Sequence, residues 1–137
     1  MIFEECPPTS TERSISDTVT AYACKRLGLS LVELRFFRES DGEPVNKGYL
    51  KNAPFDAENN ICGFSSWLLL KDVHTVWIRS GMATKELVIT IGHEIYHLSE
   101  NRSITPTNES KAEAFGQQIW QEMTTPATYW ATCLYNQ

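Results

Sequence analysis

The chain is 137 residues long, with 42% hydrophobic and 21% charged residues, which predicts one compact soluble domain spanning residues 1–137. Its formal net charge is -5 and no run of Lys or Arg interrupts this acidic balance, so nucleic acid and anionic membranes are disfavoured as direct partners. No apolar stretch is long enough for a membrane span and the first residues do not resemble a secretory signal, so we expect a cytoplasmic protein.

The first predicted helix follows a short N-terminal tail of about residues 1–12. Ser14 and Asp17 have the spacing of a capping box, and Gly28 supplies a stop signal. Apolar residues recur between them at helical spacing: Ile15, Val19, Tyr22, Ala23 and Leu27. The next segment, "LVELRFF" at 31–37, alternates apolar and charged residues, which predicts a half-buried strand.

The middle of the chain combines a long loop with a predicted hairpin. Residues 40–60 are rich in Asp, Gly, Pro and Asn and show no periodicity, which indicates a loop. The segments "CGFSSWLLL" at 62–70 and "VHTVWIRS" at 73–80, joined by Lys71 and Asp72, fit two strands of a hairpin. We therefore expect a small antiparallel sheet of about three strands.

A second predicted helix, at 84–100, carries the segment "IGHEIYHLSE". Its apolar stripe consists of Leu87, Ile91, Ile95 and Leu98. His93 and His97 lie roughly opposite this stripe and, being four residues apart, can face one metal ion together. Glu94 falls beside them, where a carboxylate can act on a metal-bound water, as in the H-E-x-x-H pattern of zinc peptidases.

A third predicted helix follows "NRSITPTN" at 101–108, with Thr105 before Pro106, or Thr107 and Asn108, as candidate caps. Its apolar stripe is Ala112, Phe115, Ile119 and Met123. Glu109 and Glu113 border this stripe. Gly116 lies between these two residues around the helix axis, where the missing side chain permits the close approach of another element. We expect residues 126–137 to form a further helix or a tail.

Catalytic zinc usually takes three protein ligands and leaves a fourth position for water. His93 and His97 supply two, and the residue types alone leave Glu109, Glu113, His74 and Glu100 open as the third. Four cysteines without C-x-x-C spacing argue against a cysteine-bound zinc.

At this point the sequence resembles the ImmA/IrrE-type metallopeptidases, a gluzincin-like family, through "HEIYH" followed by "ESKAEAF". The resemblance covers roughly residues 61–120 and implies Glu109 as the third ligand. It also implies that Glu113 orients a ligand histidine, although the family usually has Asn or Asp at this position. His74 is a candidate substrate or oxyanion contact, and the strand that contains it could present an edge to substrate.

The sequence therefore predicts an α+β, minimal zincin-like domain, in which a small antiparallel sheet packs with the H-E-x-x-H helix and flanking helices. The expected function is hydrolysis of a peptide bond in a protein substrate, with one Zn²⁺ per chain and Glu94 as the general base. By resemblance, the substrate would be a regulatory protein such as a helix-turn-helix repressor. The alternative is a catalytically silent zincin-fold module that binds or senses a protein partner.

Overall fold

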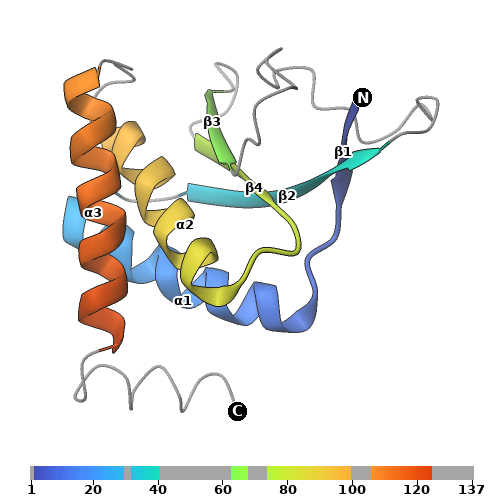
Figure 1. The fold of residues 1–137 in the computed structure, drawn as a ribbon, viewed down its shortest axis with the longest axis horizontal. Coiled ribbons are helices and arrows are strands. Elements are labelled where there is room, and N and C mark those ends of the chain that lie inside the picture. The colour runs from blue at the N-terminus through green and yellow to red at the C-terminus, as the bar shows by residue number, and fades with distance from the viewer. Residues whose placement is uncertain (1, 30–31, 41–62, 68–73, 100–105, 125–137) are drawn as a thin grey trace.

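The computed structural model describes residues 2–29, 32–40, 63–67, 74–99 and 106–124. In chain order the elements are β1 (Ile2–Cys6), α1 (Ser10–Leu27), β2 (Val32–Ser40), β3 (Gly63–Trp67), β4 (His74–Arg79), α2 (Thr84–Ser99) and α3 (Pro106–Thr124) (Figure 1). The α+β class expected from the sequence is confirmed. Within these residues, no helix has the length and apolar character needed to cross a bilayer. The expected loop, apart from its first residue, and the expected C-terminal segment lie outside them.

The sheet differs from the expected antiparallel one of about three strands. It has four strands in the order β1-β2-β4-β3. The predicted pairing of β3 with β4 is confirmed and antiparallel, and β1 is antiparallel to β2, but β2 and β4 run parallel. The long connection from β2 to β3 allows β4 to insert between them and to run parallel to β2, whereas an antiparallel sheet was expected. Consecutive buried residues Thr75 and Val76 mark β4 as an inner strand.

The N-terminal segment is not a tail. Ile2–Cys6 pairs with Phe36–Ser40, and α1 begins at Ser10, four residues before the predicted start. The capping box is formed by Thr9 and Glu12 in place of Ser14 and Asp17: the Thr9 hydroxyl accepts the Glu12 N–H, and Glu12 accepts the Thr9 N–H. Gly28 ends the helix as predicted, with a left-handed φ of 69°.

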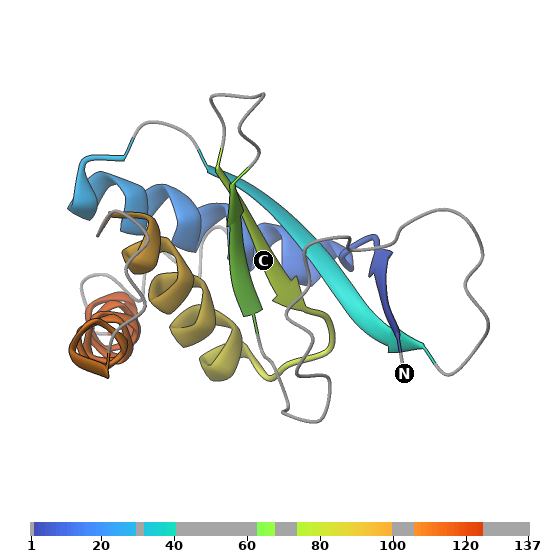
Figure 2. The same ribbon diagram turned by 90° about the horizontal axis from the view of Figure 1, so that it is seen from above.

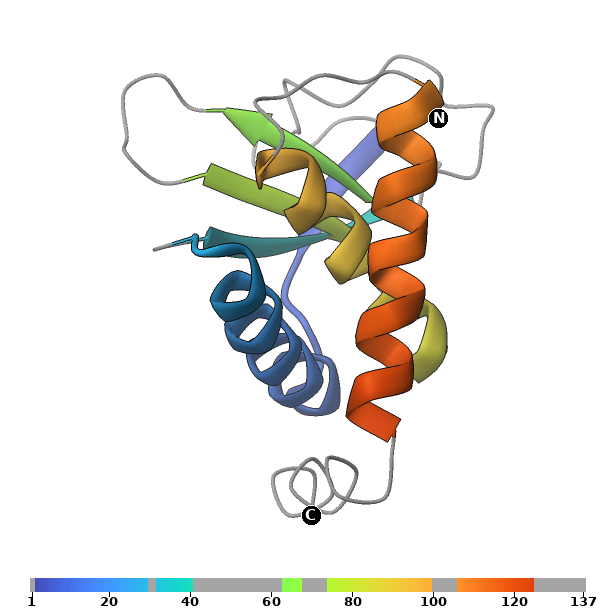
Figure 3. The same cartoon turned by 90° about the vertical axis from the view of Figure 1, so that its left-hand side faces the viewer.

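The three helices cover one face of the sheet in two layers. α1 and α2 pack beneath the strands, and α3 packs against the outer side of α2 (Figures 1 and 3). Both predicted apolar stripes, that of α2 and that of α3, are buried. α2 is the central element, because it contacts α1, α3, β3 and β4. The core joins Ile15, Val19 and Ala23 of α1, Phe36, Val76 and Ile78 of the sheet, Leu87, Ile91 and Ile95 of α2, and Phe115, Ile119 and Met123 of α3.

Candidate metal centre

The two histidines of α2 face α3. The stripe of Leu87, Ile91 and Ile95 is turned into the core, so the side of α2 that carries the histidines is available to pack against α3. His97 is buried, with 5% of its surface exposed, and the side chain of His93 is 18% exposed. The pair therefore lies near the protein surface, with the ring of His97 buried and the ring of His93 partly exposed.

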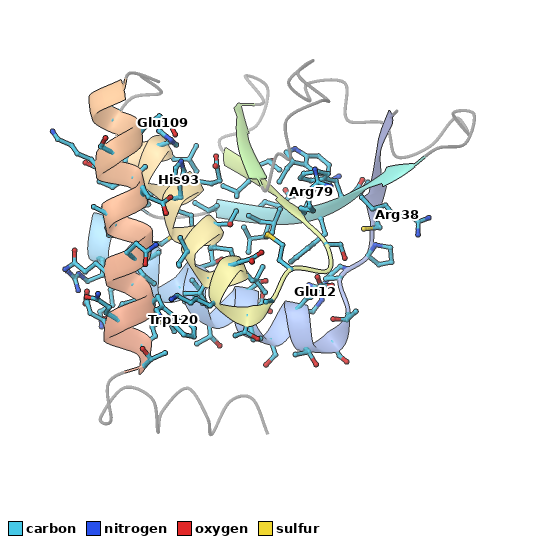
Figure 4. All side chains as sticks on the ribbon, in the orientation of Figure 1. Glu12, Arg38, Arg79, His93, Glu109 and Trp120 are labelled. Atoms are coloured by element: carbon cyan, nitrogen blue, oxygen red, sulfur yellow. The ribbon has the colours of Figure 1, made fainter. Side chains whose placement is uncertain are left out.

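The first turn of α3 brings a carboxylate to these rings. Glu109 lies just after Pro106, which begins α3, and its side chain is 46% exposed. Its Oε1 lies 2.6 Å from Nε2 of His97, and its Oε2 lies 3.3 Å from Nε2 of His93. Figure 4 shows His93 and Glu109 close together between α2 and the start of α3. Residues 16 positions apart in the chain thus converge on one point.

The separations of the donor atoms fit one metal ion. The two Nε2 atoms of His93 and His97 are 3.2 Å apart, and all three donor atoms of the group with Glu109 lie within 4.8 Å of one another. A tetrahedral zinc with donors at about 2.0–2.1 Å holds any two of them roughly 3.3–3.4 Å apart. The separations of 3.2 Å between the two nitrogens and 3.3 Å from His93 to Glu109 are close to this value, whereas the 2.6 Å from His97 to Glu109 is a hydrogen-bond distance. In the tautomers with an unprotonated Nε2, both ring nitrogens and the carboxylate present lone pairs, which a cation satisfies. His93, His97 and Glu109 can therefore hold a metal ion.

Glu113 lies one turn further along α3 and contacts the other nitrogen of His93. Its Oε2 is 3.0 Å from Nδ1 of His93. Gln117 donates to the second oxygen of the same carboxylate at 3.4 Å. A carboxylate on Nδ1 fixes the tautomer in which Nε2 carries the lone pair, so Glu113 holds the ring of His93 ready for a ligand.

The remaining groups of the motif are placed differently. Nδ1 of His97 is buried and has no hydrogen-bond partner among the described residues, so the orientation of this ring depends on packing and on what its Nε2 binds. Glu94 follows His93 on α2, its side chain is 12% exposed, and its Oε2 lies 4.0 Å from Nε2 of His93. Glu94 is thus close to one of the three donors while remaining outside the group they form.

Two glycines set the distance between the helices. A Cβ on Gly116 would lie 2.5 Å from the carbonyl oxygen of Ile89, and a Cβ on Gly92 would lie 3.0 Å from Cα of Gly116. The close approach predicted at Gly116 is confirmed, whereas Gly92 was missed. The signal available in the sequence was a glycine inside a strongly periodic helix, directly before the first histidine.

The group found among the described residues consists of His93, His97 and Glu109. His74 begins β4, where the strand pairs with Val32 on one side and Trp67 on the other. β4 is an inner strand, so the expectation that its edge receives substrate is wrong; β3 is the strand at that border of the sheet. The role expected for His74 as a substrate contact stays a prediction. Glu100 lies outside the described residues.

No family model, no curated protein and no solved structure matches this chain.

Proposed function

We propose that the protein is a zinc-dependent peptidase that cleaves a peptide bond in a protein substrate. The observation that carries the proposal is the convergence of Nε2 of His93, Nε2 of His97 and the Glu109 carboxylate, with Glu94 beside them. Two imidazoles and one carboxylate form the donor set of several catalytic zinc sites, and such a set leaves a fourth position open. The resemblance to the ImmA/IrrE-type metallopeptidases supports the same assignment.

The chemistry divides between the ion and the chain. When bound, zinc would lower the pKa of a water molecule and polarise the scissile carbonyl. Glu94 would accept the proton as that water attacks, and would pass it to the departing amine. Its small exposure keeps the carboxylate in a setting of few competing waters. Glu113 would hold the imidazole of His93 in position through Nδ1 throughout.

The edge strand β3, which contacts α2, supports a polypeptide as the substrate. β3 contacts α2, and only one side of β3 has a strand partner among the described residues. An extended segment could pair with the other side through its main chain, which would lay a peptide bond beside the helix that carries the histidines. We propose a regulatory protein such as a helix-turn-helix repressor as the substrate, an assignment that follows from the family resemblance.

The decisive experiment compares the zinc-loaded chain with Glu94→Gln. The amide keeps the shape of the side chain and removes the base, so the variant should keep the zinc and the fold but lose cleavage. The readout is mass spectrometry of candidate regulators incubated with each protein, with metal content measured in parallel. Equal cleavage by the variant would show that Glu94 is not the base. A zinc-loaded parent that binds a partner without cutting it would instead support the non-catalytic binding module.

A further inference from the structure

A groove separate from the metal centre lies between α1 and β2. It has a volume of about 430 Å³, and none of its described lining residues belongs to α2 or α3. On the helix its wall follows one stripe, formed by Arg13, Ser16, Asp17, Thr20, Ala21 and Cys24. Its other wall is the first part of β2, and Pro8 closes one end. The groove is thus a channel along α1, bounded by a strand.

The groove reaches the edge of β2. Val32, Leu34 and Phe36 share one face of the strand, while Glu33 is on the opposite face, and all four line the groove. Pro8, which follows β1 in the chain, lines the groove as well, so the groove lies at an edge of β2. Because β4 pairs with one side of β2 from Val32 to Phe37, the edge concerned is the side on which β1 lies.

Among the described residues, only part of that edge is paired with another strand. β1 pairs with Phe36–Ser40 and covers the second part of β2, whereas residues 32–35 have no strand partner on that side within the part of the chain that the structure describes (Figure 2). β1 ends at Cys6, and the chain then turns into α1 through Pro7 and Pro8. Proline lacks the N–H that would continue the ladder of hydrogen bonds, which explains why the pairing of β1 with β2 ends here.

Two hydroxyls of α1, those of Ser16 and Thr20, lie at the groove. Ser16 is 1% exposed, and neither its Oγ nor Oγ1 of Thr20 has a hydrogen-bond partner among the described residues. Burial of an unpaired hydroxyl is costly, so such a group is normally matched by a partner. The two residues are one helical turn apart, and both line the groove. Within the described part of the chain, the groove therefore offers unpaired main-chain groups on one wall and unpaired hydroxyls on the other.

We propose that this groove binds an extended peptide segment of another protein, which continues the line of β1. The segment would run antiparallel to β2, as β1 does, and would pair with residues 32–35 over roughly 13 Å. Side chains that point to α1 would meet Ser16 and Thr20, which favours a short hydroxyl or amide side chain there. The free strand edge is the reason for choosing a peptide over a small molecule. The site does not depend on the metal centre.

The test uses a library of random eight-residue peptides, displayed on phage and selected on the immobilised full-length chain. Enriched peptides are synthesised, and their dissociation constants are measured by fluorescence anisotropy. Ala21→Trp places a large ring in the groove from an exposed helical position that lines it, and Ala114→Trp makes the same exchange at an exposed position of α3. Peptides should bind the parent and Ala114→Trp alike, and should lose binding to Ala21→Trp.

A second variant tests the hydroxyl contact without blocking the groove. Ser16→Ala should leave the folded protein at least as stable, because it removes a buried group without a described partner, and should weaken peptide binding roughly three- to tenfold. Hydrogen exchange should slow at amides of residues 32–35 when peptide is bound.

Three results would overturn the proposal: no enriched peptide, peptides that bind Ala21→Trp as tightly as the parent, or protection confined to β3. Light scattering tests whether a second copy of this chain occupies the groove instead. A parent protein that is a dimer and becomes a monomer on Ala21→Trp would show that it does.

Discussion

Gly116 of α3 lies directly against the main chain of Ile89 in α2. A Cβ on Gly116 would lie 2.5 Å from the Ile89 carbonyl oxygen and 3.1 Å from Cγ2 of the same residue. The oxygen belongs to the backbone of a buried helix, so it cannot give way as a flexible side chain can. This contact lies next to the metal centre. Gly116 follows Glu113 by three residues on α3, and Ile89 precedes His93 by four residues on α2. The separation of the ligands thus depends on the absence of a single methyl group.

The first prediction concerns this contact. Gly116→Ala should push α3 away from α2, which lowers the free energy of unfolding by about 1–3 kcal/mol and carries the Glu109 carboxylate away from the two histidines. Zinc affinity should therefore fall together with stability. The measurements are urea unfolding of the metal-free protein and competition for zinc with a chelating dye. Gln118→Ala, at an exposed position of the same helix, is the control and should change neither. Unchanged zinc affinity in Gly116→Ala would show that the crossing does not position the ligands.

The helices could be predicted from the sequence because their signals are local. The apolar stripe of Leu87, Ile91 and Ile95 gave α2 its range and its buried face, and Gly28 gave α1 its end. The start of α1 was misplaced because Ser14 and Asp17 match the same spacing as Thr9 and Glu12. In the folded chain Thr9 and Glu12 form the box, and Ser80 and Gly81 also donate to Glu12 across the structure.

The sheet order could not be predicted because strand pairing is non-local. Ile2–Cys6 contains two glutamates and is not joined to its partner strand by a hairpin turn. The residues with which it pairs lie 30 or more positions further along the chain. The parallel pairing of β2 with β4 likewise depends on a chain reversal outside both strands. For the candidate site, the spacing of His93 and His97 and the resemblance pointed to a set that the structure brings together with Glu109. The spacing alone could not choose among the carboxylates, because that choice depends on how α2 and α3 cross.

The second prediction concerns metal content. The purified protein should carry about one zinc per chain, since one group of three donors is formed among the described residues. His93→Ala and His97→Ala should each abolish this content, because either change leaves only two donors. His74→Ala is the control, since this residue begins β4 and is not among the three. Elemental analysis after mild purification and zinc titration decide the matter. A parent protein that neither carries nor takes up zinc would contradict the proposed function.

The third prediction concerns acid stability through Glu12. Burial alone would raise the pKa of this carboxyl, but hydrogen bonds from the N–H groups of Gly81 and Thr9 and from the hydroxyls of Ser80 and Thr9 lower it below its usual 4.5. A carboxyl with a lowered pKa in the folded state stabilises the fold above the unfolded value and loses this contribution as pH falls through the folded value.

Stability of the metal-free parent should therefore decline below about pH 4.5 more steeply than that of Glu12→Gln, which has no proton to gain. The comparison is urea unfolding of both proteins from pH 6 to pH 3 in the presence of a chelator, so that metal release does not contribute. Glu12→Gln should also be less stable at pH 6, because it loses the charged acceptor shared by α1 and the β4–α2 turn. Curves that stay parallel across the range would show that Glu12 does not contribute through its charge.

The last prediction separates the two carboxylates of α3. Glu109 has oxygens 2.6 Å and 3.3 Å from Nε2 of His97 and His93, whereas Glu113 approaches only Nδ1 of His93, at 3.0 Å. Glu109→Ala removes a donor and should abolish tight zinc binding. Glu113→Ala leaves all three donors and should weaken zinc roughly 10–100-fold, as is typical of a group that orients a ligand.

Glu113→Gln sharpens this comparison, because its amide oxygen can still accept the Nδ1–H of His93. Its zinc affinity should lie between those of the parent and Glu113→Ala, whereas Glu109→Gln should bind zinc much more weakly than the parent, since an amide is a poor substitute for a ligand carboxylate. Dye competition gives the four affinities, and a crystal structure with zinc would place a Glu109 oxygen about 2.0–2.2 Å from the ion. The assignment of the two carboxylates would be wrong if Glu113→Ala lost zinc as completely as Glu109→Ala, or if a Glu113 oxygen lay at that distance. The two histidines would remain ligands in either case.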